Sequence, residues 1–284
     1  MVRVELLPVE SLLYRSPLVT IGRLDCEAAD PLFRDSGATV NDLVVFPRSS
    51  VGIVHDGRPL FVSTSANVNF YNRGQRYRRK RIDERDRCDW FALDGELILE
   101  IAREESDPKG ERPFSFAYGP LDAAHFLAER RLVRDISSGR LAPLEIEERS
   151  LGLVRNLIRS AQAVWSAPSP ASCPSPSRKH RDLAETAKAI LADANDDRLS
   201  LGAIAAEAGV SPYHLSRVFR AVTGKTLADY RRDLRLFRAA DVISETSVAL
   251  TTVAADLGFV SHSHLTFDFR RRFGITPSRL RAGN

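Results

Sequence analysis

Short apolar runs separated by polar positions recur from about residue 18 to residue 101. Each run is rich in β-branched or aromatic residues, and Gly, Asn, Asp or Pro separates it from the next. Such runs are typical of strands in an antiparallel sandwich or barrel. The pattern predicts strands at Leu18–Ile21, Leu43–Phe46, Val51–Val54, Leu60–Val62, Val68–Tyr71 and Leu97–Ile101.

From about Asp122 the apolar positions recur every three or four residues, which is the period of an amphipathic helix. The stripe consists of Ile146, Leu153, Val154, Leu157, Ile158, Ala161 and Trp165. A stripe of this kind packs either on its own domain or on a second subunit. The pattern favours self-packing slightly and leaves a homodimer open.

A segment rich in Pro and Ser interrupts the apolar pattern at 166–177. Its sequence is SAPSPASCPSPS, with five Ser and four Pro in twelve residues. Proline fixes φ and removes backbone donors, so we expect an exposed, partly extended linker. We therefore predict a β-rich sensor or dimerisation domain at 1–165, the linker at 166–177 and a helical domain at 178–284.

The helical domain contains an internal repeat with an offset of 50 residues. Ser211–Arg231 and Ser261–Arg281 share eight identical residues in 21 ungapped positions. In the first copy these are Ser211, His214, Leu215, Phe219, Arg220, Gly224, Thr226 and Arg231. The second copy has one additional residue in its turn, GFVS against GVS. The repeat indicates two copies of one small structural unit.

Each copy predicts two short helices joined by a turn that contains glycine. The expected apolar face of the first helix consists of Leu201, Ile204, Ala205 and Ala208. Gly209 can take the unusual φ that ends this helix. Ser211 is suited to cap the next helix, with Pro212 at its first position. This pattern is typical of a helix-turn-helix, whose second helix enters the major groove of DNA.

The segment between the two copies predicts one long helix over residues 227–243. Leu227, Tyr230, Leu234 and Phe237 recur at helical spacing, and Arg231, Arg235 and Arg238 form another stripe. The helix would be about 25 Å long at 1.5 Å per residue. A rod of that length can place two recognition helices in successive major grooves, which lie about 34 Å apart along the duplex.

The composition is typical of a soluble globular protein. The charge, however, is distributed unevenly along the chain. Its 284 residues are 43% hydrophobic and 27% charged, which argues against a disordered, collagenous or membrane chain. The formal net charge is +4. Residues 178–284 hold 17 Lys+Arg against 12 Asp+Glu, whereas 1–177 hold 24 against 25. The basic excess lies in the helical domain, which favours a polyanionic partner.

The cysteines and the N-terminal residues indicate the cellular compartment in which we expect the protein. Cys26, Cys88 and Cys173 are odd in number and form no C-x-x-C pair, which disfavours a disulfide framework or a cysteine-based zinc site. Residues 1–7 lack the apolar core of a signal peptide, and no run of about 18 apolar residues follows. We expect a cytoplasmic location and no membrane partner.

The motifs of residues 178–284 resemble the DNA-binding domain of the AraC/XylS family of transcription regulators. That family's tail reads roughly A-x-x-x-G-F, S-x-F/L-x-x-x-F and F-G-x-T-P-x-x-x-R. The matching residues here are Ala254, Gly258, Phe259, Ser263, Leu265, Phe269, Phe273, Gly274, Thr276, Pro277 and Arg281. The resemblance covers about 100 residues and implies a β-rich, often cupin-like N-terminal domain that binds an effector or dimerises.

The resemblance also implies which residues read bases. Early residues of each recognition helix do so in the family, here Pro212, Tyr213, Ser216 and Arg217, and then His262, Ser263, Thr266 and Phe267. Arg217 can contact guanine in a bidentate manner. Phe267 departs from the family pattern, which commonly has Arg there, and Asp268 follows it. We therefore expect the second helix to act mainly through phosphate contacts. The arginines proposed for DNA contact are Arg220, Arg231, Arg235, Arg270, Arg271, Arg272 and Arg279.

Other polar clusters are weaker candidates. The basic run Arg73–Arg81 reads as an exposed loop or strand edge balanced by acids, or as a site for a polyanion or an acidic effector. His262 and His264 face apart on a helix, which disfavours a metal pair. No cupin-type H-x-H spacing, Gly-rich phosphate loop or G-x-S-x-G motif occurs in the N-terminal domain. We expect no metal site, cofactor or catalytic residue.

The sequence therefore predicts a two-domain α+β protein: a β-sandwich or barrel with C-terminal helices, then an all-α double helix-turn-helix domain. The expected function is sequence-specific DNA binding that regulates transcription, modulated by a small molecule or by dimerisation. Double-stranded DNA is the expected partner, and the resemblance adds RNA polymerase. The alternatives are a cupin-like or DNA-repair enzyme fused to a DNA-binding tail, and a regulator that works by dimerisation without an effector.

Overall fold

The computed structural model describes residues 6–35, 37–55, 57–106, 108, 110–166, 177–193 and 199–283. The chain divides into two compact units. One consists of 1–58 and 65–167, and the other of 59–64 and 168–284. The proposed linker, apart from Ser166 and Ser177, lies outside the described residues, as does Cys173.

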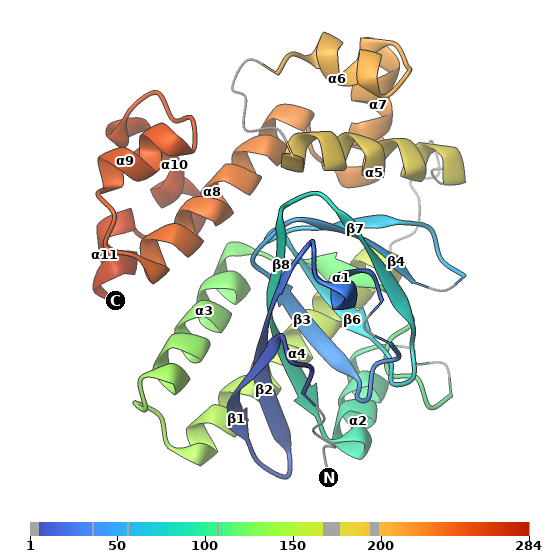
Figure 1. Cartoon of the computed structure of the whole chain (residues 1–284), viewed down its shortest axis with the longest axis vertical. Coiled ribbons are helices and arrows are strands. Elements are labelled where there is room, and N and C mark those ends of the chain that lie inside the picture. The colour runs from blue at the N-terminus through green and yellow to red at the C-terminus, as the bar shows by residue number, and fades with distance from the viewer. Residues whose placement is uncertain are drawn as a thin grey trace. The chain divides into compact units, whose positions relative to one another are not determined.

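Nine strands in the described part of the chain form two sheets (Figure 1). They are β1 (Glu10–Arg15), β2 (Val19–Glu27), β3 (Leu43–Pro47), β4 (Val51–His55), β5 (Phe61–Ser63), β6 (Asn67–Tyr71), β7 (Tyr77–Arg81), β8 (Arg85–Leu93) and β9 (Tyr118–Pro120). The larger sheet has the order β1-β2-β8-β3-β6-β9, and the smaller has the order β5-β4-β7. The strands thus form a two-sheet arrangement within a β-rich region, as predicted.

The centre of the larger sheet is the antiparallel pair β2 and β8. Their register runs from Val19 opposite Leu93 to Glu27 opposite Arg85. Gly22 stands opposite Trp90, and a Cβ at position 22 would lie 2.2 Å from the indole Cζ2. The glycine is therefore required for the close approach of the indole to the β2 backbone.

One predicted strand is wrong. Leu97–Ile101 lies inside helix α2 (Gly95–Glu105), where the side chain of Asp94 accepts a hydrogen bond from the backbone N–H of Glu96. Ile98, Ile101 and Ala102 are buried at helical spacing. A short apolar run does not by itself distinguish a strand from a buried helix face, and the aspartate cap decides for the helix.

Strand β7 reads YRRKR and carries too little apolar signal to be predicted. Strand β8 begins with the charged run RDR but ends in the buried apolar run Trp90–Leu93, which is not among the predicted strands. β7 lies at one end of the order β5-β4-β7 and pairs with β4 from Val51 opposite Arg81 to His55 opposite Tyr77. The basic run Arg73–Arg81 therefore includes a strand at the edge of a sheet.

The region contains other described helices besides α2. They are α1 (Pro31–Arg34), α3 (Ala123–Ser137) and α4 (Pro143–Ser166). α4 contacts α2, α3 and β9, and its buried side is the predicted stripe from Ile146 to Ala161. The stripe packs within its own unit, although Trp165 at its end stays half exposed and donates an indole N–H to the carbonyl oxygen of Tyr118 at 2.7 Å.

Seven helices make up the described part of the C-terminal region. They are α5 (Arg178–Asp193), α6 (Leu201–Glu207), α7 (Pro212–Thr223), α8 (Leu227–Glu245), α9 (Leu250–Asp256), α10 (His262–Phe273) and α11 (Pro277–Ala282). α8 runs from the pair α6–α7 to the pair α9–α10 (Figure 1). We call α6 with α7 the first head and α9 with α10 the second head. The two-domain fold class, with an all-α double helix-turn-helix, is confirmed.

The repeat is reproduced in the caps of both recognition helices. The hydroxyl of Ser211 accepts from the backbone N–H of His214 at 3.2 Å, and that of Ser261 accepts from His264 at 3.1 Å. Gly224 and Gly274 end the helices with φ of 72° in each case. Equivalent residues at equivalent caps place α7 and α10 in equivalent positions of their heads.

Candidate nucleic-acid interface

The first head turns its predicted base-reading residues to solvent. Leu215, Val218 and Phe219 are buried on the inner side of α7. The outer side carries Pro212, Tyr213, Ser216, Arg217 and Arg220, all exposed, with Tyr213 at 79%. Leu201, which was expected on the apolar face of α6, is exposed instead, and Ile204 and Ala205 alone of that helix are buried. Leu201 is the first residue of α6, so no preceding helical turn lies under its side chain.

The second head has the same division. Leu265, Phe269 and Phe273 are buried on the inner side of α10. The predicted reading residues His262, Ser263 and Phe267 are exposed, and Thr266 is half exposed. Of the predicted phosphate contacts, Arg270 and Arg271 on α10 and Arg279 on α11 are exposed. These predicted contact residues therefore lie at the solvent-exposed surface of the second head.

Two of the predicted DNA contacts hold the second head together instead of standing free. Arg235 on α8 donates from Nη1 to the carbonyl oxygen of Gly258 at 2.8 Å, and its guanidinium lies 5.1 Å from the ring centre of Phe259. Arg272 on α10 places Nε 3.0 Å from a carboxylate oxygen of Asp233 on α8. Arg231, on the same helix as Arg235, is half buried. The arginine stripe of α8 therefore includes structural contacts.

Asp268 does not face the proposed DNA surface. Its carboxylate is nearly buried and lies 3.7 Å from Nε of Arg232 and 3.3 Å from Nε2 of His264. With the pair of Arg272 and Asp233, this gives two ion pairs between α8 and α10, with the acid on a different helix in each. The pairs fix α10 against the connecting helix and keep the carboxylate of Asp268 away from phosphate.

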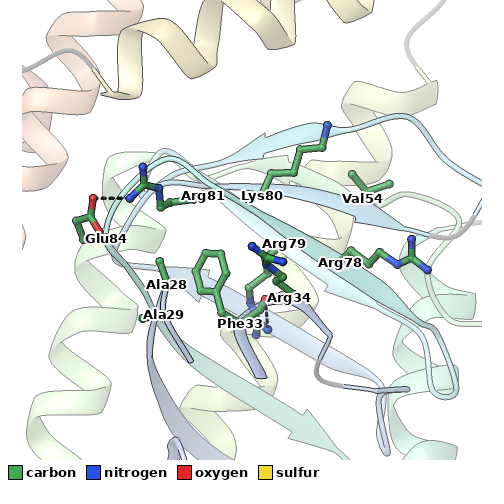
Figure 2. Close-up of a pocket in the computed structure, with 10 residues that line it drawn as sticks. All are labelled: Ala28, Ala29, Phe33, Arg34, Val54, Arg78, Arg79, Lys80, Arg81 and Glu84. Carbon is green, nitrogen blue, oxygen red and sulfur yellow. Dashed lines mark hydrogen bonds and ion pairs between the residues drawn. The ribbon is translucent and has the colours of Figure 1, made fainter. Parts of the chain in front are cut away.

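The N-terminal region carries a basic cavity along β7 (Figure 2). It has a volume of about 730 Å³. The lining residues are Ala28, Ala29, Phe33, Arg34, Val54, Arg78, Arg79, Lys80, Arg81 and Glu84. Figure 2 shows the ion pair of Arg81 with Glu84, at 3.0 Å, at one end and Arg78 at the other. The cavity therefore combines apolar walls with an excess of cations.

Strand geometry explains the charge of this cavity. Arg79 points inward and pairs with the carboxylate of Asp86, and its Nη2 donates to the hydroxyl of Tyr77 at 2.9 Å. Alternation along β7 then sends Arg78 and Lys80 to the other face, where both are exposed. No ion pair to Arg34, Arg78 or Lys80 occurs among the residues that the structure describes. Their charges are available to an anion.

Among the residues that the structure describes, no cluster of three or more His, Cys, Asp or Glu is able to hold a metal ion. Cys26 and Cys88 are buried thiols, and burial raises the pKa of each above its ordinary value. Among the described helices, none combines the length and apolarity needed to cross a membrane.

Each of the two exposed recognition helices is the second helix of a helix-turn-helix, and α8 connects the two heads. This arrangement defines a class of DNA-binding proteins. A family model described as a helix-turn-helix domain matches residues 204–283. Regulatory protein SoxS of Escherichia coli K12 is 36% identical over 102 residues, which cover 36% of this chain and 95% of SoxS. This chain therefore belongs to the family of regulators with an AraC-type helix-turn-helix domain, and the resemblance inferred from its motifs is confirmed.

Solved structures give further likenesses. A transcriptional regulator of AraC type from Chromobacterium violaceum is 30% identical, covers 37% of this chain and 95% of its own, and has a TM-score of 0.35. ToxT from Vibrio cholerae, solved with a bound unsaturated fatty acid, is 10% identical, covers 94% and 95% of the two chains, and has a TM-score of 0.39.

Proposed function

We propose that this protein is a sequence-specific DNA-binding regulator of transcription, with α7 and α10 in successive major grooves of one duplex. The observation that supports this most strongly is the pair of capped recognition helices with solvent-exposed outer sides on one connecting helix. α8 has 19 residues and is about 28 Å long. That length is close to the separation of about 34 Å between successive turns of the major groove.

The partners, the cellular location and the oligomeric state are proposed from the resemblance to the family. Promoter DNA is the expected partner, and contact with RNA polymerase, a cytoplasmic location and homodimerisation are proposed on the same ground. The predicted domains, with a sensor or dimerisation domain at 1–165 and a DNA-binding domain at 178–284, are part of the proposal. Footprinting or genome-wide capture of bound DNA tests the central claim, because binding to every sequence alike at physiological salt would refute it.

The first head is expected to read one guanine through Arg217. Arg217→Ala should weaken binding to the preferred site about tenfold or more, because a bidentate arginine–guanine pair discriminates by about 1–3 kcal/mol. Most of the loss should vanish on DNA that carries another base at that position. The measurement is a set of dissociation constants on the preferred site and on its single-base variants.

Arg271→Ala provides the matched control in the second head. Arg271 is exposed near the end of α10, where it can meet phosphate. Its loss should weaken binding to all sequences alike and reduce the slope of log K against log salt by about one. If Arg217→Ala also weakened every sequence alike, the assignment of the first reading head would be wrong.

We also propose that the cavity along β7 binds a small anionic effector with an apolar body. The exposed cations Arg34, Arg78 and Lys80 supply the charge. Ala28, Ala29 and Val54 line the same cavity, are not buried, and supply apolar contact. Cavities of several hundred Å³ with apolar walls and a few convergent polar groups are typical of small-molecule sites.

The effector site is tested with 2-naphthoate as an anionic probe and 2-naphthamide as its neutral counterpart. Calorimetric titration of the full chain should show binding of the carboxylate and weaker binding of the amide. The double substitution Arg78→Gln/Lys80→Gln should weaken naphthoate binding about tenfold, as loss of two partly screened charge contacts implies. Arg76→Gln, which lies outside the cavity lining, should leave it unchanged. Equal binding of both probes, or no effect of the double substitution, would contradict the site.

A further inference from the structure

The two heads are copies of one unit, yet their exposed centres differ in chemistry. At an offset of 50 residues, Arg217 on α7 corresponds to Phe267 on α10, and both are exposed. Further along the same stripe, Arg220 and Arg270 are identical in type and both exposed. The two heads therefore share a cation near the end of the helix that can meet phosphate. They differ at the predicted base-reading positions, and the change from Arg217 to Phe267 replaces a cation with an apolar ring.

Phe267 is an unusual residue for a solvent-exposed helix face. Its side chain is 66% exposed, on the side of α10 opposite the buried Leu265 and Phe269. Helix amphipathicity would place a phenylalanine inward, because exposing an apolar ring to water is unfavourable. About two thirds of Phe267 is not covered by packing inside the described unit, so its ring is available for an apolar contact outside it.

The additional residue in the second turn exposes another apolar side chain. A hydrophobic residue just before a helix N-cap often packs on the fourth helical residue. In the first head that residue is Val210, which is partly buried. In the second turn Phe259 is buried, its ring 5.8 Å from that of His264, and Val260 is left 91% exposed. The second head thus presents two apolar side chains, one before α10 and one on it.

The carboxylate of Asp268 would oppose an apolar contact between Phe267 and DNA, but it is directed away from the exposed face of α10. Asp268, next to Phe267, is held by Arg232 and His264 in the packing between α8 and α10. The exposed side of α10 around Phe267 carries Ser263, Arg270 and Arg271, which are neutral or cationic. An apolar ring surrounded by such residues can approach the floor of a major groove without bringing a carboxylate near phosphate.

We propose that the second head reads sequence, and that Phe267 recognises the 5-methyl group of a thymine in the major groove. Thymine is the base whose groove edge carries a methyl group, and apolar side chains read it by contact. The first head would then select guanine through Arg217 and the second thymine through Phe267, so the DNA site is asymmetric. This inference rests on the proposed function and replaces the expectation that α10 acts mainly through phosphate contacts.

The test removes the methyl group without altering base pairing. The preferred DNA site of the full chain is first obtained by selection from random duplexes. Each thymine in the half of the site bound by the second head is then replaced singly by deoxyuridine, and dissociation constants are measured. One replacement should weaken binding about fourfold, which is the effect of losing burial of one methyl group. No loss at any position in that half would overturn the inference.

Two variants assign the effect to its residue. Phe267→Ala should bind the thymine and deoxyuridine duplexes equally, while Arg217→Ala should keep the fourfold difference. Phe267 and Arg217 are both exposed, so thermal unfolding of each variant should match that of the parent chain. If Phe267→Ala retains the full difference between the two duplexes, another group reads the methyl and the assignment is wrong.

A third variant transfers the chemistry of the first head to the second. Phe267→Arg should change the preferred base at the same position from thymine to guanine, as selection from random duplexes would show. Retention of thymine there would contradict the assignment of Phe267. The proposed function fails separately: a chain that prefers no sequence at all gives no site on which to place deoxyuridine.

Discussion

Replacing Phe269 with alanine should lower the free energy of unfolding of the C-terminal region by about 3–5 kcal/mol, the usual cost of truncating a buried phenylalanine. Phe269 is fully buried on the inner side of α10, and its ring centre lies 4.5 Å from that of Phe273. Phe273 in turn packs edge-on against Phe237 of α8 at 5.5 Å. The substitution therefore opens a cavity where the second head meets the connecting helix.

The chain allows the two regions to be followed separately. Its two tryptophans, Trp90 and Trp165, lie in the region of β8 and α4, so their fluorescence reports on the N-terminal unit. The second region is helical throughout its described part, so circular dichroism at 222 nm is sensitive to its loss. Phe269→Ala should shift the circular dichroism transition in urea to lower concentration and leave the fluorescence transition nearly unchanged.

Phe267→Ala is the matched control, because it truncates the same residue type two positions away. Phe267 faces solvent, so its truncation should change the free energy of unfolding by about 0.5 kcal/mol or less. Equal destabilisation by the two substitutions would mean that Phe267 packs inside the unit. That result would also remove the structural basis for thymine recognition.

Arg48→Ala should destabilise the N-terminal unit by about 3–5 kcal/mol at neutral pH, because it leaves a buried carboxylate without its main partner. Asp89 on the central strand β8 is fully buried, and Nε of Arg48 donates to its carboxylate at 2.6 Å. Burial alone would raise the pKa of Asp89. The guanidinium groups of Arg48, Arg130 and Arg23 outweigh burial and hold this pKa at about 2.

The pH dependence gives this prediction a second readout. The folded pKa of Asp89 lies below its unfolded value of about 3.9, so the unfolded chain takes up the proton first as the pH falls. The contribution of the pair is therefore present above about pH 4 and is lost between about pH 4 and pH 2. The difference in stability between the parent chain and Arg48→Ala should narrow over that range.

Arg23→Ala serves as the comparison in the same cluster. Arg23 on β2 stands opposite Asp89 and donates to it at 2.8 Å, but its side chain is partly exposed. Solvent screens this contact, so its loss should cost about 1 kcal/mol. Urea titrations followed by tryptophan fluorescence measure both variants. A larger loss for Arg23→Ala than for Arg48→Ala would show that the buried partner is not the dominant one.

Local signals were sufficient for the two recognition helices of the C-terminal region. Ser211 before Pro212 and Gly224 after Thr223 set the ends of α7, and the repeat gives the same ends to α10 through Ser261 and Gly274. Caps act within four residues of sequence, so they can be read without knowledge of the fold. The same holds for the apolar stripes of α4 and α8.

Contacts between segments that are distant along the chain could not be predicted from the sequence. Arg235 and Arg272 were expected at phosphate because exposed arginines on a basic domain usually favour it. The structure places their guanidinium groups against Gly258 and Asp233, 23 and 39 positions away. An unpaired Asp268 would be unfavourable beside DNA, but Arg232 and His264 hold its carboxylate in the packing of the second head. No pattern of spacing identifies which arginine of a stripe meets a carbonyl from another turn.

The sequence by itself determined the class of this protein, because the repeat, its caps and its apolar spacing are local and recur at a fixed offset. Tertiary structure decided which charges remain for a ligand. Contacts with distant segments take Arg235, Arg272 and Asp268 out of the exposed surface, and strand alternation leaves Arg78 and Lys80 exposed while Arg79 is buried. Charge availability depends on neighbours that are distant in sequence, and only folding brings those neighbours together.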